Sequence, residues 1–221
     1  MWKFIVLAVA GALVVVLLGV ADAGATGALV CLDPGHGGTE SGAVYSKRGR
    51  DGFTLLEKEI NLDVALHLRD ALDAGGFVVL MTRESDQTVS LQERVDICNG
   101  AGADIAVSVH TNSTYSSRWD GAMTLTNKPA DQLLAETVHP IMYSGLKENW
   151  DGRFTDYGIN VDEWFIPKYT TMPAVILEPV FMSNHDEAAA LRATVDQTPT
   201  GRRGKIVEVE YEGILAYFGL N

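Results

Sequence analysis

Residues 28–33 read ALVCLD, and residues 34–38 read PGHGG directly after them. The first run is short and apolar, which is typical of a buried strand, whereas the second combines a proline with three glycines and must be a loop. This loop carries a histidine, His36. A loop that follows a strand and presents a metal-binding side chain is a common position for a functional site, so we expect the site here.

A helix is predicted after this loop. Ile60, Val64, Leu68 and Leu72 lie four residues apart, which is the spacing of one helical face, and they predict a helix over residues 60–74. A pair of glycines closes this helix, and an apolar strand is expected next, at residues 77–81.

Strands and helices continue to alternate towards the C-terminus. Ser90 and Glu93 form a capping box that predicts a second helix, and residues 105–109 form a strand that ends at His110. The other predicted elements are strands at residues 122–126 and 174–177, the latter followed by Glu178, and helices at residues 131–147, from Asn184, and at residues 205–218. The alternation predicts a single α/β domain with a twisted, mostly parallel sheet flanked by helices on both faces.

The composition limits the class of partner. The chain has 221 residues, of which 47% are hydrophobic, so it is long enough for one well-packed domain. Its 29 acidic residues outnumber 17 basic ones and give a formal net charge of -12, which repels phosphate backbones. We therefore expect no nucleic acid partner.

The first residues predict export. Residues 4–21 are an unbroken apolar run behind Lys3, and residues 21–23 read ADA, a small-x-small cleavage pattern. Residues 1–23 are therefore predicted to be a signal peptide or an uncleaved N-terminal anchor that contacts the membrane through residues 4–21. Either alternative leaves residues 24–221 as a folded domain outside the cytoplasm.

The chain has two cysteines, Cys31 and Cys98. An oxidising compartment permits a disulfide between them, but one lies in a strand-like segment and the other in a helical one. The sequence therefore favours two buried free thiols, and neither is expected to be catalytic.

Potential metal ligands stand at strand ends. His36, His110 and Glu178 each follow or end a predicted strand, and Glu57 precedes the first helix. Because the carboxyl ends of parallel strands meet at one edge of a sheet, these residues can share one site. Two imidazoles and one carboxylate give Zn²⁺ three ligands and leave a position for water, while another carboxylate can carry a proton.

Taken singly, these residues also fit structural roles. A loop histidine is often only hydrogen-bonded, and Glu57 can simply be part of a charged helix start. Glu178 is the least ordinary of the four, because an acid that ends an apolar strand is expected to be buried and to have a raised pKa.

Five motifs in order identify a resemblance. They are residues 32–38 (LDPGHGG), 57–62 (EKEINL), 82–83 (TR) with 90–94 (SLQER), 107–110 (VSVH), and 173–178 (PAVILE) with 183–184 (SN). Across residues 28–218 the chain resembles the zinc-dependent N-acetylmuramoyl-L-alanine amidases of the Amidase 3 type.

The resemblance implies a complete assignment. One Zn²⁺ per chain is bound by His36, Glu57 and His110, and Glu178 is the catalytic acid/base. The implied reaction is hydrolysis of the amide bond between the N-acetylmuramic acid lactyl group and L-alanine. The implied partner is a peptidoglycan glycan strand with its stem peptide, reached by residues 24–221 on the cell-wall side of the membrane.

The sequence departs from the family after the catalytic glutamate. Where such enzymes usually have a glycine two places on, this chain has Val180, preceded by Pro179, so the loop must follow a different backbone path. Thr111 after the second histidine is a milder change. The change at Pro179 and Val180 keeps one alternative open, a catalytically impaired wall-binding or regulatory module. A zinc peptidase that acts on another wall amide is a second alternative, because zinc, water and a glutamate would serve equally well for a peptide bond.

Residues 127–130 leave no room for the inhibitory helix that some family members carry, so we expect activity without an activator. Other residues have no assigned chemistry. His67, His139 and His185 are expected to have surface or packing roles, and Arg83 and Arg94 to form ion pairs that hold helix to sheet. The aromatic residues Trp119, Trp150, Trp164 and Tyr169 fit a sugar-binding surface and ordinary packing equally well.

Overall fold

A computed structural model describes residues 27–49, 52–148, 150, 153–198 and 200–220. The predicted signal peptide or anchor, residues 1–23, lies outside these residues. Within the described part of the chain, no helix is both long enough and apolar enough to cross a membrane.

The centre of the fold is a six-stranded sheet with the order β4-β1-β5-β8-β6-β7. The strands β4 (Val78–Met81), β1 (Leu29–Pro34), β5 (Ile105–Val109) and β8 (Ala174–Glu178) run parallel to one another. The next strand, β6 (Gly121–Thr126), is antiparallel to β8, and the edge strand β7 (Thr155–Val161) is parallel to β6. The prediction of a mostly parallel sheet is confirmed.

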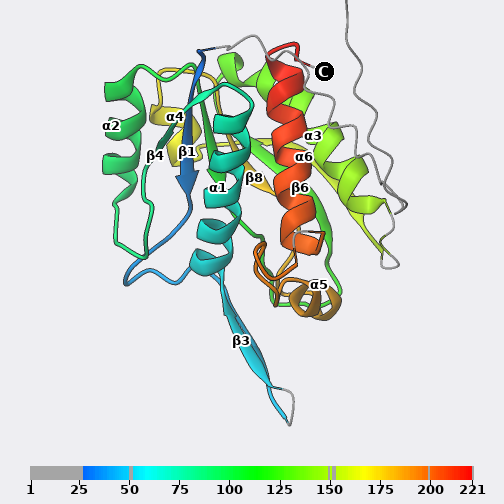
Figure 1. The fold of residues 1–221 in the computed structure, drawn as a ribbon. Helices are drawn as coiled ribbons and strands as arrows, with labels where there is room; N and C mark the ends of the chain where they lie inside the picture. Colours follow the sequence, from blue (N-terminus) through cyan, green and yellow to red (C-terminus); the bar gives the residue numbers. More distant parts are fainter. Residues whose placement is uncertain (1–26, 50–51, 149, 151–152, 199, 221) are drawn as a thin grey trace, which may run out of the picture.

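Helices cover both faces of this sheet (Figure 1). On one face α1 (Glu57–Ala74), α3 (Gln132–Lys147) and α6 (Arg202–Tyr217) pack together, and on the other α2 (Leu91–Ala101) contacts α4 (Phe165–Tyr169). Alternate residues of β1 divide between the faces: Val30 and Leu32 join the large core with α1, whereas Cys31 joins the smaller cluster next to α2. The short elements η1 (Pro129–Asp131) and α5 (His185–Ala190) complete the helical set.

The prediction of two free thiols is wrong. Cys31 in β1 and Cys98 in α2 form a disulfide, and their Cα atoms are 5.6 Å apart. The strand-like and helical patterns were read correctly, but Cys31 points to the face that α2 covers, which a local pattern does not reveal. The disulfide therefore fastens α2 to the centre of the sheet.

Most predicted elements are present with shifted ends. The helix predicted from residue 60 begins at Glu57, and the terminal helix begins at Arg202 rather than residue 205. The strands β2 (Val44–Lys47) and β3 (Phe53–Leu56), together with β7 and α4, were not predicted. The β2 and β3 strands form a hairpin that projects beyond the end of the sheet to which β1 points (Figure 1).

Candidate active site

The four predicted site residues meet at one end of the sheet. His36 follows β1, His110 follows β5, Glu178 is the last residue of β8, and Glu57 is the first residue of α1. Because β1, β5 and β8 are parallel neighbours, their carboxyl ends lie along the same edge. The fold thus gathers side chains that are up to 142 positions apart, from His36 to Glu178.

Three of these residues form a compact group of possible metal ligands. One ligand atom each from His36, Glu57 and His110 lies within 4.8 Å of the other two. His36 Nε2 is 3.2 Å from Glu57 Oε2, and His110 Nδ1 is 2.9 Å from Glu57 Oε1. A tetrahedral zinc ion with bonds of about 2.0–2.1 Å places its ligand atoms roughly 3.3 Å apart. The donor set and its spacing therefore fit a zinc ion.

Glu57 is held as an anion between the two imidazoles. Burial by itself would raise its pKa, but hydrogen bonds from His110 and His36 and their positive charges hold the pKa well below its ordinary range. Burial likewise opposes the charged form of both histidines, yet the hydrogen bond to Glu57 raises the pKa of each.

Glu178 has the opposite character. Its Oε2 is buried without a hydrogen-bond partner, and burial raises the pKa of its carboxyl group to about 7. The negative charge of Glu57 acts in the same direction, whereas the two imidazoles act against it. A carboxyl group with a pKa near neutrality can both accept and release a proton, which is the property required of an acid/base catalyst.

The loop at His36 has an unusual backbone. His36 has a φ of 60°, and it is the one non-glycine residue with a positive φ among those the structure describes. Such a left-handed conformation is strained in a non-glycine residue and persists only where its surroundings impose it. The next two residues, Gly37 and Gly38, also have positive φ values, of 135° and 57°.

Arg94 of α2 helps to impose this conformation. Its Nη2 donates to the His36 carbonyl at 2.6 Å, while Nη1 donates to the Pro34 carbonyl and to Asp33 Oδ1, both at 2.6 Å. Burial alone would raise the pKa of Asp33, but the Arg94 charge and hydrogen bonds from two hydroxyl groups lower it. The predicted ion pair between helix and sheet is therefore present, and the same guanidinium also holds the loop.

Arg83 holds the other side of the loop, in a way that was not predicted. Its guanidinium is buried and donates to the carbonyl oxygens of Pro34 at 2.8 Å, Gly35 at 2.9 Å and Lys58 at 2.9 Å. These bonds join the His36 loop to the first turn of α1. The predicted ion pair is not what anchors Arg83, because its partners are backbone carbonyls.

Two glycines allow the site residues to approach closely. A Cβ atom on Gly35 would lie 2.2 Å from the His110 ring. A Cβ atom on Gly42, whose φ is +63°, would lie 2.5 Å from Glu57 Oε2 and 2.6 Å from the His36 ring. Gly42 was not singled out from the sequence, because no neighbouring residue indicates that the side chains of His36 and Glu57 lie against it.

Hydrogen bonds from residues other than the two histidines also position the Glu57 carboxylate. Asn61, one helical turn later, donates to Glu57 Oε1 at 3.3 Å, and Thr111 Oγ1 donates to the side-chain oxygen of Asn61 at 2.8 Å. The backbone N–H of Ala43 donates to Glu57 Oε2 at 2.8 Å. Asn61 belongs to the EKEINL motif, so its sequence signal was present but its role was not assigned. Thr111, a milder departure from the family, supports the carboxylate.

The loop after Glu178 follows a regular path. Asn112 accepts from the Met182 N–H at 2.8 Å and donates to the Val180 carbonyl at 2.9 Å, so residues 180–182 extend the parallel pairing beyond β8. Val180 is fully buried in the core. Val180 is not among the residues with a positive φ, so this loop does not need the left-handed conformation that a glycine permits.

Two adjoining cavities open at the site. One, of about 340 Å³, is lined by the four site residues with Ala43 and Asn112 among others, and the second, of about 260 Å³, by His36, His110 and apolar side chains including Leu91. Trp164 lines both. Of the other three aromatic residues, Trp119 packs on Tyr157, Trp150 lies under Arg202, and Tyr169 packs on Phe165.

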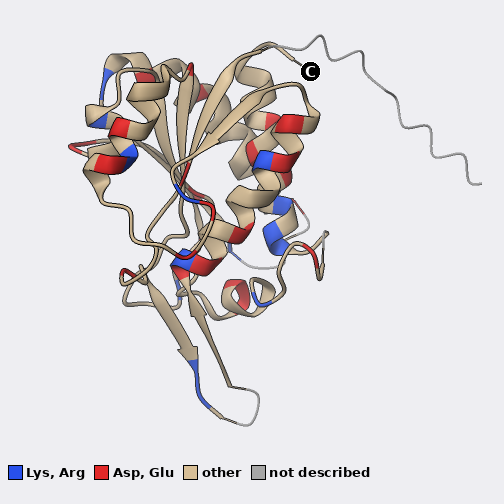
Figure 2. Cartoon of the chain, turned by 60° about the vertical axis from the view of Figure 1, so that its left-hand side comes forward, with Lys and Arg blue, Asp and Glu red and all other residues tan. Residues whose placement is uncertain are grey.

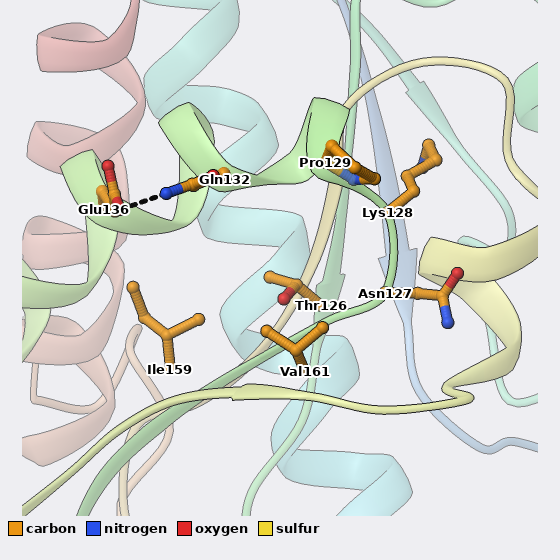
Figure 3. A pocket seen from close by; sticks show the side chains of 8 residues that line it. All are labelled: Thr126, Asn127, Lys128, Pro129, Gln132, Glu136, Ile159 and Val161. Carbon is orange, nitrogen blue, oxygen red and sulfur yellow. Dashed lines mark hydrogen bonds between the residues drawn. The ribbon is translucent and has the colours of Figure 1, made fainter.

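Another cavity lies away from these residues. It has a volume of about 410 Å³ and is formed between β7 and the start of α3, with Ile159, Val161 and Gln132 among its lining residues (Figure 3). It contains none of the four predicted site residues.

The remaining histidines lie apart from the group of possible metal ligands, and each forms a hydrogen bond elsewhere. His67 hydrogen-bonds the Asp63 carbonyl at 2.8 Å, and His185 bonds the Tyr45 hydroxyl at 2.9 Å. His139 is buried between Thr124 and Asp156, at 3.0 and 2.9 Å.

Comparisons with known proteins agree with this geometry. The Amidase 3 family model, described as N-acetylmuramoyl-L-alanine amidase, matches residues 30–203. N-acetylmuramoyl-L-alanine amidase LytC of Bacillus subtilis is 32% identical over 87% of this chain, which spans 36% of LytC. The germination-specific N-acetylmuramoyl-L-alanine amidase of the same organism is 32% identical over 87% of this chain and 81% of its own length.

A solved structure gives the same result for the fold. The catalytic domain of CwlV, an N-acetylmuramoyl-L-alanine amidase from Bacillus (Paenibacillus) polymyxa var. colistinus, superimposes with a TM-score of 0.75 and 30% identity. The match covers 88% of this chain and 99% of that domain. With a family match that spans most of the sheet and a metal-ligand group at its carboxyl edge, the chain belongs to the N-acetylmuramoyl-L-alanine amidase family.

Proposed function

We propose that this chain is a zinc-dependent amidase that separates stem peptides from the glycan strands of peptidoglycan. The bond cut is the amide between the N-acetylmuramic acid lactyl group and L-alanine. One observation carries the proposal: His36, Glu57 and His110 present ligand atoms within 4.8 Å of one another in a cavity that also contains the buried carboxyl of Glu178.

One Zn²⁺ would be held by His36, Glu57 and His110. When bound, it supplies a Lewis acid that polarises an amide carbonyl and lowers the pKa of a coordinated water. The chain prepares these three ligands before any metal arrives, because Asn61 and the Ala43 N–H orient the Glu57 carboxylate and the Glu40 carboxylate accepts a hydrogen bond from His36 Nδ1 at 3.0 Å.

Glu178 would move the protons. Its pKa of about 7 leaves a useful fraction of carboxylate at neutral pH, which takes a proton from the attacking water. The same group then delivers the proton to the departing nitrogen of L-alanine, so that the amine leaves in neutral form. The unpartnered Oε2 of Glu178 is free to make these hydrogen bonds.

The proposed setting is outside the cytoplasm. The disulfide between Cys31 and Cys98 supports this setting, because such bonds persist mainly in oxidising compartments. The apolar residues 4–21 are proposed to act as the export signal or as an anchor that places the domain beside the wall.

The test is release of free stem peptide from purified peptidoglycan by residues 24–221. Release is expected to stop with a chelator, to return when zinc is added, and to fall by roughly 10²–10⁴-fold in Glu178→Gln. Glu136→Gln is the matched control, because Glu136 lies in the separate cavity of Figure 3.

Two other outcomes of this experiment would each favour one of the alternative functions. Zinc binding without release of peptide would reject the amidase proposal in favour of a wall-binding module. Cleavage inside the stem peptide, rather than at the lactyl amide, would identify a zinc peptidase.

A further inference from the structure

The hairpin formed by β2 and β3 is basic, although the protein is acidic. Residues 44–56 contain three basic residues, Lys47, Arg48 and Arg50, and one acidic residue, Asp51, within a chain of net charge -12. Figure 2 shows basic residues on the projecting hairpin, whereas acidic residues are spread over the body of the domain. The hairpin therefore has a local charge of the opposite sign to the rest of the molecule.

The described basic side chains of this region are free to bind an anion. Lys47 and Arg48 are exposed, and neither forms an ion pair with any residue that the structure describes. Arg192, also exposed, stacks over the Phe53 ring, with its guanidinium carbon 4.6 Å from the ring centre. Because Phe53 is the cross-strand partner of Lys47, their side chains share one face of the hairpin, next to Arg192.

The base of the hairpin is fixed to the site. Ala43, the residue before β2, lines the cavity that contains the four site residues, and β3 leads directly into Glu57. The Tyr45 hydroxyl bonds His185, which opens α5 after the Glu178 loop. A strand rises about 3.3 Å per residue, so Lys47 lies roughly 13 Å along the hairpin from Ala43.

From this arrangement we infer that Lys47, Arg48 and Arg192 form a docking surface for the carboxylates of stem peptides on the peptidoglycan strand that occupies the site. The inference rests on the proposed function. A stem peptide carries a terminal carboxylate, and neighbouring stem peptides on one strand repeat that negative charge. Lys47 and Arg48 lie too far along the hairpin from its base to touch the bond being cut, so they would act on the length of polymer beyond the site.

The test measures binding of the zinc-loaded Glu178→Gln protein to insoluble peptidoglycan from which phosphate polymers have been removed. Adding Lys47→Gln and Arg48→Gln is expected to weaken binding by roughly three- to tenfold and to reduce its dependence on salt. Lys147→Gln with Lys205→Gln is the matched control, which removes one exposed positive charge from α3 and one partly buried positive charge from α6 and is expected to leave binding unchanged. Arg192→Lys keeps the positive charge, so the protein that carries it is expected to bind peptidoglycan as tightly as the Glu178→Gln parent. The protein with Arg192→Gln is expected to bind more weakly.

Three outcomes would overturn the inference: unchanged binding in the hairpin variant, an equal loss in the control, or a loss seen only on peptidoglycan that retains its phosphate polymers. Release of stem peptide by the protein with Glu178 intact, measured on the same material, tests the proposed function separately. Absence of release would reject the amidase proposal alone, whereas release together with unchanged binding of the hairpin variant would reject the docking surface alone.

Discussion

Arg94 performs two tasks with one guanidinium, since it neutralises the buried Asp33 and fixes the carbonyl of His36. Replacing it with methionine should destabilise the metal-free protein by about 3–5 kcal/mol, because a buried carboxylate loses its cation. The same change should weaken zinc binding by roughly 10–100-fold, because the ligand loop loses its support. Denaturant unfolding and competition with a chelator measure the two effects.

A conservative variant separates these tasks. Arg94→Lys keeps the positive charge but lacks the planar fork, so it should recover part of the stability and little of the zinc affinity. Arg69→Met is the control for loss of an arginine, since Arg69 pairs at the surface with Asp70 and Glu84 and should cost about 0–1 kcal/mol. Normal zinc affinity in a folded Arg94→Met protein would show that the loop does not need this support.

Gly42 and Gly158 provide a matched pair of substitutions. Both have a left-handed backbone, with φ values of +63° and +69°, so alanine should cost each site roughly 1–2 kcal/mol. An added Cβ meets Glu57 and His36 at Gly42, but meets no atom within 4 Å at Gly158. Zinc titration of the two variants should therefore show a loss for Gly42→Ala alone, and an equal loss in both would attribute the effect to backbone strain.

At the level of elements, α6 contains a buried acid without a partner. Both carboxylate oxygens of Glu210 are buried and unpaired, and burial raises the pKa of this group from 4.5 to about 8. Between these values the folded protein binds more protons than the unfolded chain, so stability is greatest below pH 4.5 for this group and falls as the pH rises towards 8.

The expected slope is at most about 1.4 kcal/mol per pH unit. Glu210→Gln cannot ionise and should remove this component, so its advantage in unfolding free energy over the parent protein should grow between pH 5 and pH 8. A constant difference across that range would mean that Glu210 does not change its protonation state on folding.

The disulfide connects β1 to α2 across 67 positions of sequence. Closing a loop of this length in the unfolded chain is expected to stabilise the fold by about 4 kcal/mol. A reductant should therefore lower the unfolding free energy of the parent protein and leave that of Cys31→Ala with Cys98→Ala unchanged. If denaturant midpoints are the same with and without reductant, the bond contributes no stability.

The elements that the sequence predicted are those whose burial leaves a local pattern. Central strands such as β1 and β5 are covered on both faces and read as apolar runs, and α1 shows its buried face every four residues. The hairpin projects from the sheet and has few buried positions, and β7 is an exposed edge strand. Neither therefore shows an alternation of apolar and polar residues. The five-residue α4 is too short to show a period.

For the whole molecule, the sequence predicted which side chains meet at the site but not the hydrogen bonds that hold the site loop in place. Strand ends converge in any parallel sheet, so His36, His110 and Glu178 could be placed together from their positions alone. The contacts of Arg83 and Arg94 with backbone carbonyls join residues that are about fifty to sixty positions apart and leave no local signal. The disulfide was missed for the same reason.

The chain is expected to act without an activator. Residues 127–130 pass directly from β6 through η1 into α3, and none of them lines either of the two cavities at the site. Purified residues 24–221 loaded with zinc should therefore release stem peptide at once. A lag or complete inactivity that a second protein relieves would contradict this expectation.

The direction of β1 also decides how the domain would stand on a tether. The strand runs from Leu29 to Pro34, about 17 Å, and ends at the ligand loop, so Gly27 lies at the opposite pole of the domain. If residues 4–21 remain in a lipid bilayer, as proposed, the chain enters the domain at the pole opposite to the catalytic edge and the hairpin. The enzyme would then act on glycan layers at some distance from the membrane surface rather than on peptidoglycan that lies against the lipid.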